Sequence, residues 1–232
     1  MKRYEIAGLQ VDMEVSGRTA LQAAPYEVDS NGPADVVLTC DDQRILELNP
    51  QLQTLEMAQY MGTGRYFSQA LLQFDGLYLH SSAVMLDGKA YLFSAPSGTG
   101  KSTHAEKWCR LFGAIYINDD KPVLRCKDGL WSAYGTPWSG KHDLSTPAGY
   151  PVGGIAFVHR GKENSLERMQ PAQALSLFLS QSLWKMGDKE KMAKQLQMVG
   201  DLLTKVPVWK LTCNLEDAAA HMSRQGMQEG QL

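Results

Sequence analysis

The chain has 232 residues, of which 44% are hydrophobic and 21% are charged, and its formal net charge is −2. This length allows one substantial hydrophobic core with a small additional lobe, and the composition is that of an ordinary globular protein. The near-neutral balance and the lack of a Lys/Arg-rich stripe exclude an electrostatic basis for nucleic-acid binding.

The cysteines and the N-terminal residues indicate which metal sites, disulfides and cellular location to expect. The four cysteines are widely spaced and form no Cys-x-x-Cys pair, so the sequence predicts neither a zinc site nor a disulfide framework. Met1-Lys2-Arg3 is followed at once by mixed polar sequence, and the chain contains no long apolar span. We therefore expect a cytoplasmic protein that does not contact membranes.

The first fifty residues show the pattern of short strands separated by turns. Apolar or alternating stretches at 4–9, 11–15 and 36–39 predict the strands, and Asp-Ser-Asn-Gly-Pro at 29–33 is a turn signal. We expect residues 1–50 to form a small β-rich N-terminal part.

Residues 51–222 alternate between helical and strand patterns, which indicates an α/β domain. Residues 52–73 follow a helical pattern that we expect to break at the glycines of 62–64. The later patterns predict strands at 77–86, 89–94, 114–117, 121–126, 130–134, 152–159 and 206–212, and helices at 101–111, 171–186, 188–203 and 216–222. In the helix that opens at Pro171, Trp184 and Met186 occupy positions typical of core packing. We expect residues 223–232 to form a frayed tail.

The stretch Ala-Pro-Ser-Gly-Thr-Gly-Lys-Ser-Thr connects a predicted strand to a predicted helix. It matches a P-loop in which alanine replaces the first glycine, and glycines in such a loop let backbone N–H groups point at phosphates. The helix that follows adds the positive end of its dipole, the lysine can reach the β- and γ-phosphates, and the serine hydroxyl can hold Mg²⁺. The predicted nucleotide-binding residues are Ala95, Pro96, Ser97, Gly98, Thr99, Gly100, Lys101, Ser102 and Thr103.

Two adjacent carboxylates, Asp119 and Asp120, end the strand that follows the predicted loop helix. Ligands of open α/β sheets bind at the carboxyl ends of the strands, so we expect this pair to face the phosphates. Phosphoryl transfer needs a carboxylate to support Mg²⁺ and a group to orient or deprotonate the attacking hydroxyl. Two neighbouring aspartates can divide these roles.

His80 lies on the predicted strand at 77–86, whose hairpin partner leads into the loop. Pairing in this hairpin brings the histidine beside the phosphate end only if the register allows it. From spacing alone, a partly buried structural histidine is as good an interpretation as a catalytic one.

These motifs, taken together and in order, resemble the catalytic domain of the HPr kinase/phosphorylase family, whose fold is related to that of phosphoenolpyruvate carboxykinase. The similarity covers residues 75–125 well and the rest only in the order of strands and helices. In that family the histidine and lysine are catalytic, and the aspartate pair supplies the base and supports the metal. The resemblance implies catalytic roles for His80, Lys101, Asp119 and Asp120, with Asp120 as the base and with Ser102 and Asp119 at the Mg²⁺ ion.

The resemblance also implies a class of substrate. Members of the family phosphorylate a serine of a small phosphocarrier protein, some run the reverse phosphorolysis, and they often assemble as oligomers. The present chain lacks the family's long N-terminal domain and its downstream Arg-Gly-Leu-Gly-Ile signature. It resembles compact accessory members, some of which phosphorylate serine in peptide natural-product precursors.

Two further segments are weaker candidates. The loop Gly-Thr-Pro-Trp-Ser-Gly-Lys-His at 135–142 can close over the nucleotide or the acceptor through Lys141 and His142, or it is a turn with a solvated lysine. His159 and Arg160, at the end of a predicted strand, can supply a cation to the γ-phosphate or form a plain strand-end charge pair.

The sequence thus predicts an α/β fold with a mixed sheet flanked by helices, a P-loop that follows an antiparallel hairpin, and a small β-rich N-terminal part. The predicted function is a kinase that uses ATP and Mg²⁺ to phosphorylate a serine-type hydroxyl of a peptide or small protein. A small-molecule kinase shares every residue named above. An ATP-binding regulatory or partner subunit needs the loop, but neither His80 nor Asp120.

Overall fold

The computed structural model describes residues 1–182 and 188–229. Its N-terminal part holds a small sheet of three strands in the order β1-β2-β3. Strands β1 (Lys2–Ile6) and β2 (Leu9–Met13) form a hairpin, and β3 (Val36–Leu38) runs parallel to β2. The positive φ angles of Ala7 and Gly8, +54° and +69°, produce the tight turn between β1 and β2. The predicted N-terminal sheet is therefore present.

Short helices accompany this sheet, which the strand-and-turn pattern did not predict. They are α1 (Gly17–Ala23), the 3₁₀ turn η1 (Ala24–Tyr26) and α2 (Asp42–Leu48). The side chain of Asp41 accepts a hydrogen bond from the backbone N–H of Arg44, which caps the start of α2. Both α-helices have seven residues, which is too short to produce a clear helical period.

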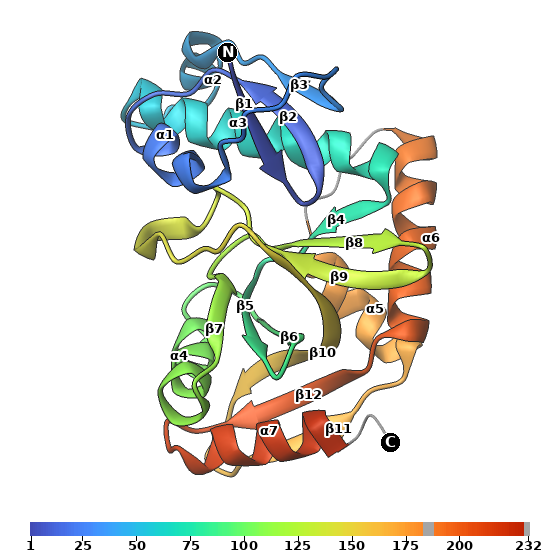
Figure 1. Ribbon diagram of the computed structural model, residues 1–232. Helices are drawn as coiled ribbons and strands as arrows, with labels where there is room; N and C mark the ends of the chain where they lie inside the picture. The colour runs from blue at the N-terminus through green and yellow to red at the C-terminus, as the bar shows by residue number, and fades with distance from the viewer. Residues whose placement is uncertain (183–187, 230–232) are drawn as a thin grey trace.

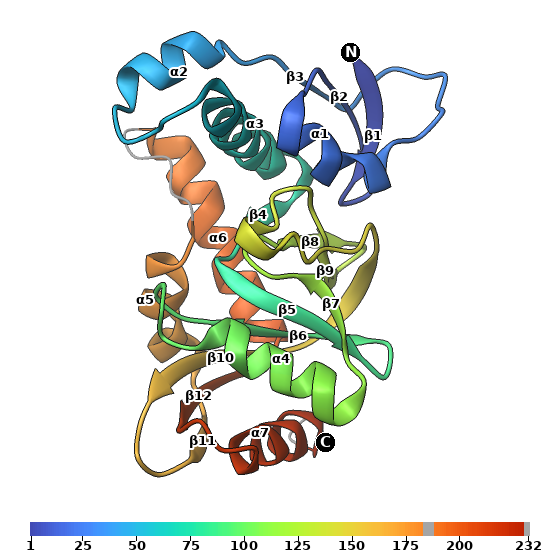
Figure 2. The ribbon, with the colours of Figure 1, turned by 90° about the vertical axis from the view of Figure 1, so that its left-hand side faces the viewer.

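The larger sheet is mixed and curled (Figures 1 and 2). Its main path runs β4-β8-β9-β10-β6-β5-β7, and β12 joins β10 and β11 beside this path. The bounds of the strands are β4 (Gly76–Tyr78), β5 (Ser81–Leu86), β6 (Lys89–Ser94), β7 (Ile115–Asn118), β8 (Val123–Lys127), β9 (Leu130–Tyr134), β10 (Gly149–Arg160), β11 (Ser165–Arg168) and β12 (Val208–Cys213). The first residues of β10 pair antiparallel with β9, and its later residues pair in parallel with β6 and β12. One long strand thus connects the two halves of the sheet.

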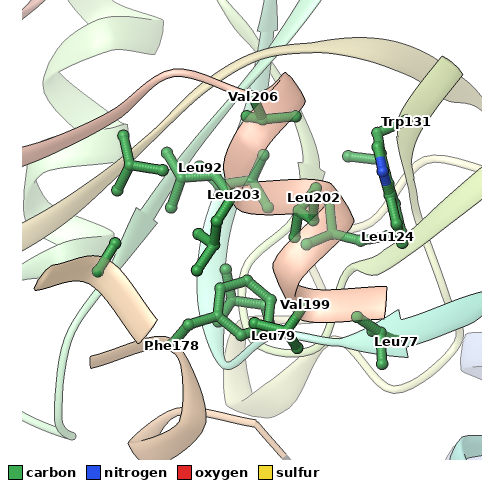
Figure 3. Packing of buried hydrophobic residues seen from close by; sticks show 14 of the residues in the cluster. Leu77, Leu79, Leu92, Leu124, Trp131, Phe178, Val199, Leu202, Leu203 and Val206 are labelled. Atoms are coloured by element: carbon green, nitrogen blue, oxygen red, sulfur yellow. The ribbon is translucent and has the colours of Figure 1, made fainter. Parts of the chain in front are cut away.

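Helices cover both faces of this sheet. They are α3 (Leu55–Leu71), α4 (Lys101–Phe112), α5 (Pro171–Ser180), α6 (Lys189–Lys205) and α7 (Ala218–Glu229). Successive side chains of β6 alternate between the faces, so Leu92 packs with α5 and α6, while Phe93 packs with α4 and α7. Figure 3 shows the first of these cores, where Leu92 and Phe178 lie near Leu202 and Leu203 of α6. A mixed α/β sheet flanked by helices confirms the predicted fold class.

Helix α3 is one continuous helix, so the predicted break at residues 62–64 is wrong. Both glycines of this stretch lie where a neighbour approaches the helix closely. A Cβ on Gly62 would lie 2.4 Å from Ile45, and a Cβ on Gly64 would lie 2.9 Å from Trp138. Glycine inside a helix costs about 1 kcal/mol relative to alanine. Packing of α2 and Trp138 against the bare helix surface offsets that cost.

The predicted single strand over residues 77–86 is also wrong. The chain forms β4 and β5 instead, and they pair with different partners: β4 with β8, and β5 with β6 and β7. Helix α7 runs to Glu229 rather than ending at Met222, because Ser223 and Met227 are buried against the sheet layer. Trp184 and Met186, expected in the helix that opens at Pro171, lie outside the described residues.

No helix among the described residues combines the length and the apolar character needed to cross a lipid bilayer.

Candidate functional site

Residues 95–103 form the loop between β6 and α4, as the sequence predicts. The loop turns through two glycines with positive φ, Gly98 at +78° and Gly100 at +121°. A Cβ at either glycine would meet no atom within 4 Å, so the backbone conformation rather than space requires glycine there. The first turn of a helix leaves its N–H groups without helical partners. The loop and the start of α4 therefore offer backbone donors that can bind an anion.

Lys101 is the first residue of α4 and is only 8% exposed. Burial lowers the pKa of its ammonium group below the ordinary value of 10.5, although the carboxylates of Asp120 and Asp119 oppose this shift. No hydrogen bond of its Nζ to another described residue is present. A partly desolvated cation beside the loop can bind an anion strongly.

Three side-chain oxygens meet beside the loop. The hydroxyl of Ser82 donates a hydrogen bond of 2.6 Å to Oδ1 of Asp119, and its oxygen lies 3.2 Å from Oγ of Ser102. Ser82 is fully buried on β5, and Asp119 follows β7 directly and is 6% exposed. Because β5 pairs with both β6 and β7, it brings the end of β7 beside the start of α4. A carboxylate and two hydroxyls form a set of oxygen donors that suits a hard cation such as Mg²⁺.

A second group of charges surrounds Asp120. Nε2 of His80 lies 3.4 Å from Oδ1 of Asp120, and Lys121 forms an ion pair with Oδ2. Burial by itself would raise the pKa of Asp120, but the contact with His80 and the charge of Lys121 outweigh it and lower the pKa to about 2. Nδ1 of His80 lies 3.1 Å from Oε1 of Gln181, which orients the ring. Asp120 is thus an ionised carboxylate held between two basic groups.

The strand register places His80 beside the loop, a point that the sequence left open. Ser81 pairs with Ser94, the last residue of β6, so His80 stands next to the first loop residue, Ala95. The hydroxyl of Ser94 also donates a hydrogen bond of 2.8 Å to the carbonyl of His80. The structure therefore brings His80, the loop and the aspartate pair to one end of the sheet.

The loop at 135–142 is anchored rather than free. Trp138 is fully buried and stacks on Phe67 at 5.1 Å between ring centroids. Gly140 packs so closely on Asp120 that a Cβ would lie 2.9 Å from that residue's own Cβ. Lys141 and His142 are exposed, and no described contact joins either to Asp120. This loop therefore packs closely against Asp120 but adds no charge beside its carboxylate.

Arg18 of α1 ties the N-terminal part to this loop. Its Nη2 donates hydrogen bonds to the carbonyl of Gly140 at 2.9 Å and to Asp143 at 2.8 Å. Because Gly140 packs on Asp120, the N-terminal part contacts the carboxylate through a single intermediate residue.

Arg160, at the end of β10, contacts the loop from the other side. Its guanidinium donates to the carbonyl of Thr99 at 3.1 Å and to that of Gly98. His159 beside it points into the protein, where its buried Nε2 has no hydrogen-bond partner among the described residues. Of these two candidates, only Arg160 contacts the loop.

A groove of about 660 Å³ lies next to the loop, between the start of α4 and the segment after β12. Thr103, Arg160 and Lys162 are among its lining residues. On its wall, Lys107 is fixed by hydrogen bonds to the carbonyls of Leu215 and Glu216. The groove is open to a ligand that extends from the loop, and its volume is in the range of small-ligand pockets.

Sequence reasoning missed Ser82, Lys121 and Gly140. One signal for Ser82 was available, because residues two apart on a strand point to the same side, and Ser82 stands two residues after His80. The pattern at 121–126 predicts a strand that begins at Lys121, and the residues around Gly140 indicate only a turn. The contacts of Ser82 with Asp119 and of Gly140 with Asp120 join segments that sequence spacing does not relate.

Comparison with known proteins identifies the family. The family model described as "SynChlorMet cassette protein ScmC" matches residues 45–219, and the chain belongs to this family. Among solved structures, the chain is similar to the structure of the Hpr(Ser) kinase/phosphatase from Coxiella burnetii, with a TM-score of 0.41 and 9% identity over 67% of this chain and 99% of that chain. No curated protein sequence matches the chain. The family match includes His80, the 95–103 loop and the aspartate pair.

Proposed function

We propose that this protein is a kinase that transfers the γ-phosphoryl group of ATP to a serine-type hydroxyl of a peptide or small protein. The observation that carries the proposal is the meeting of three features at one end of the sheet. These are the 95–103 loop with Lys101, the oxygen cluster of Ser82, Ser102 and Asp119, and the pair of His80 and Asp120. Each corresponds to one requirement of phosphoryl transfer: phosphate binding, a metal site and a group for the acceptor hydroxyl.

The loop and Lys101 hold the phosphates in this proposal. The backbone donors of the loop and the ammonium of Lys101 neutralise negative charge on the β- and γ-phosphates. Arg160 keeps the loop in shape through its bonds to two loop carbonyls. The groove lined by Thr103 and Lys162 takes the nucleoside, since it is continuous with the loop.

The cluster of Ser102 and Asp119 fits Mg²⁺ by its chemistry, because hydroxyl and carboxylate oxygens are the ligands that this cation prefers. When bound, Mg²⁺ supplies positive charge that offsets the charge of the β- and γ-phosphates. Ser82 holds the carboxylate of Asp119 in place through its hydrogen bond of 2.6 Å. We therefore propose Ser102 and Asp119 as the residues at the metal.

Asp120 receives the acceptor hydroxyl. The hydroxyl oxygen attacks the γ-phosphorus in line, the bond from that phosphorus to the bridging oxygen of ADP breaks, and the acceptor proton passes to Asp120. A pKa of about 2 makes Asp120 a weak base in the free protein but keeps it ionised. A weak base suffices when the transition state is loose, because the proton is then transferred late. The side chain of Asp120 is 23% exposed, so an acceptor hydroxyl can reach its carboxylate.

The test is the transfer of labelled γ-phosphate from ATP into a size-fractionated extract of the source cell, with Lys101→Ala as the inactive variant. Lys141→Ala is the matched control, since Lys141 is exposed and contacts neither the loop nor Asp120. We expect label in a peptide or protein fraction with the wild type and the control, and none with Lys101→Ala. Normal turnover by Lys101→Ala would refute the assignment.

The same experiment separates the alternatives. Label confined to small molecules would identify a metabolite kinase on this scaffold. ATP binding without any transfer would identify a regulatory or partner subunit. Loss of transfer in Asp120→Asn with unchanged affinity for ATP would favour an enzyme over a nucleotide sensor.

A further inference from the structure

A hollow of about 550 Å³ lies between α3, α6 and β4. One face of α3, all three residues of β4, and the side chains of Lys121, Trp138 and Gln195 line it. In Figures 1 and 2, β4 lies below α3, with α6 alongside. We call this space the β4 hollow.

On the edge of β4 that faces away from β8, two residues have backbone groups with no partner among the described residues. Strand β4 ends the main path of the sheet and pairs only with β8 among the described strands. The N–H of Cys126 donates to the carbonyl of Asp75 at 2.9 Å, and the N–H of Leu79 donates to the carbonyl of Pro122 at 3.5 Å. Alternate residues of an antiparallel strand direct their backbone groups to opposite sides. The backbone groups of Gly76 and Tyr78 therefore point away from β8, and no backbone bond of either to another described residue is present.

At the next outward-facing residue of this edge, the protein's own chain already forms a backbone hydrogen bond. His80 is the following residue in the same alternation, and its N–H donates a hydrogen bond of 2.8 Å to the carbonyl of Gln181. Gln181 belongs to the irregular segment after α5. The same edge can therefore pair with extended chain at Gly76 and Tyr78. Both residues are buried, and unpaired backbone groups away from water are unfavourable, so pairing with a ligand gains free energy.

The lining of the β4 hollow favours an acidic ligand. Arg65 and Lys121 contribute positive charge, and the described residues that line the hollow include no aspartate or glutamate. The described lining thus offers positive charge, above all that of the exposed Arg65, and no carboxylate of its own that would repel an acidic peptide.

The β4 hollow lies next to the proposed catalytic carboxylate. Lys121 lines it and forms an ion pair with Asp120. Tyr78 and His80 are two residues apart, which corresponds to about 7 Å of extended chain. A side chain that a ligand presents at the Lys121 end of the hollow is therefore close to Asp120.

We propose that the phosphoryl acceptor binds in the β4 hollow as a short extended peptide with acidic residues, paired to the backbone of Gly76 and Tyr78, with its serine directed toward Asp120. This inference rests on the proposed function, since it identifies the acceptor of that reaction. It selects a peptide over a small metabolite, because an extended peptide carries the alternating N–H and C=O groups that pair with the edge of a strand.

Two synthetic pools of heptapeptides with a central serine test the proposal, one with Asp/Glu and one with Lys/Arg at the other positions. We expect the wild type to label the acidic pool at least about tenfold better, because acidic side chains can pair with Arg65 whereas Lys/Arg side chains are repelled by it. Arg65→Glu should remove or reverse this preference without affecting folding, since Arg65 is exposed. Arg44→Glu is the matched control, because Arg44 is exposed on α2 and is not among the residues that line the hollow.

N-methylation of the best peptide, one amide at a time, tests backbone pairing. If the peptide pairs with β4, methylation of every second amide should reduce labelling. Each reduction should be about tenfold, because one hydrogen bond is lost and its partner on β4 stays buried without water. Uniform tolerance of N-methylation, or an unchanged preference in Arg65→Glu, would overturn the proposal even with an active kinase.

Amide hydrogen exchange at Gly76 and Tyr78 tests binding without catalysis. Saturation with the acidic pool should slow exchange at both amides in the wild type and equally in Lys101→Ala. Slowed exchange without any phosphoryl transfer would support the peptide site and reject the kinase. Unchanged exchange would reject the peptide site, whether or not phosphate is transferred.

Discussion

Ser82→Ala should destabilise the protein more than its small size suggests. The hydroxyl of Ser82 donates 2.6 Å to the carboxylate of Asp119, and both residues are buried. The variant leaves that carboxylate without this donor and also removes the oxygen that lies 3.2 Å from Ser102. A lost hydrogen bond to a charged, buried group costs about 1.5–3 kcal/mol of unfolding free energy.

The neighbouring residue provides the matched control. Ser81 is equally buried on the same strand, but its hydroxyl donates to a neutral carbonyl, that of Leu79, at 3.2 Å. Ser81→Ala should therefore cost only about 0.5–1.5 kcal/mol. Both substitutions remove the same atom at the same burial, so the difference between them measures what Ser82 gains from the charged Asp119 and from its contact with Ser102.

Urea unfolding at pH 7, followed by fluorescence of the buried tryptophans, measures both values. Equal destabilisation by the two substitutions would refute the reasoning, because it would mean that the hydroxyl of Ser82 does not stabilise the carboxylate of Asp119.

Three further predictions concern Asp120 and the 95–103 loop, which we propose binds the phosphates. The pKa of Asp120, about 2, lies below its ordinary value of 3.8, so its contribution to stability is present above about pH 4 and disappears as the pH falls to about 2. The difference in unfolding free energy between the wild type and Asp120→Asn should shrink over that interval, and a constant difference would contradict the assignment. Gly140→Ala should lower phosphoryl transfer, because its Cβ would displace Asp120, whereas Gly129→Ala should not. Both glycines have a similar positive φ, +76° and +79°, but no atom lies within 4 Å of a Cβ at Gly129, so equal activities would argue against a positioning role for Gly140. Arg160→Ala should raise the Kd for ATP about tenfold by releasing two loop carbonyls. Isothermal titration calorimetry checks this, and an unchanged Kd would show that the loop keeps its shape without Arg160.

The local sequence determined the turns, the 95–103 loop and the helix that follows it, because these depend on the conformations that neighbouring residues accept. Glycine at positions 98 and 100 is required by positive φ, and the chain after Lys101 forms a helix that ends at Gly113, whose φ is +71°. The hairpin turn at Asp87 and Gly88 likewise follows from residues that accept positive φ. The loop, the helix after it and the strand that carries the aspartate pair could therefore be predicted from the sequence.

Tertiary packing decided where one helix continues and where one predicted strand divides into two. The glycines of α3 suggested a break, but contacts with α2 and Trp138 keep the helix continuous. The apolar run at 77–86 suggested one strand, but its two halves pair with different strands.

The surroundings of the aspartate pair also depend on pairing between distant segments. Ser82 meets Asp119, and Gly140 meets Asp120, only because β5 pairs with β7 and the 135–142 loop folds back onto the sheet. The sequence by itself determined the candidate phosphate loop and the order of the elements. Strand register and helix packing, which bring together residues far apart in the chain, decided what surrounds the two carboxylates and left Gly76 and Tyr78 of β4 without a backbone partner among the described residues.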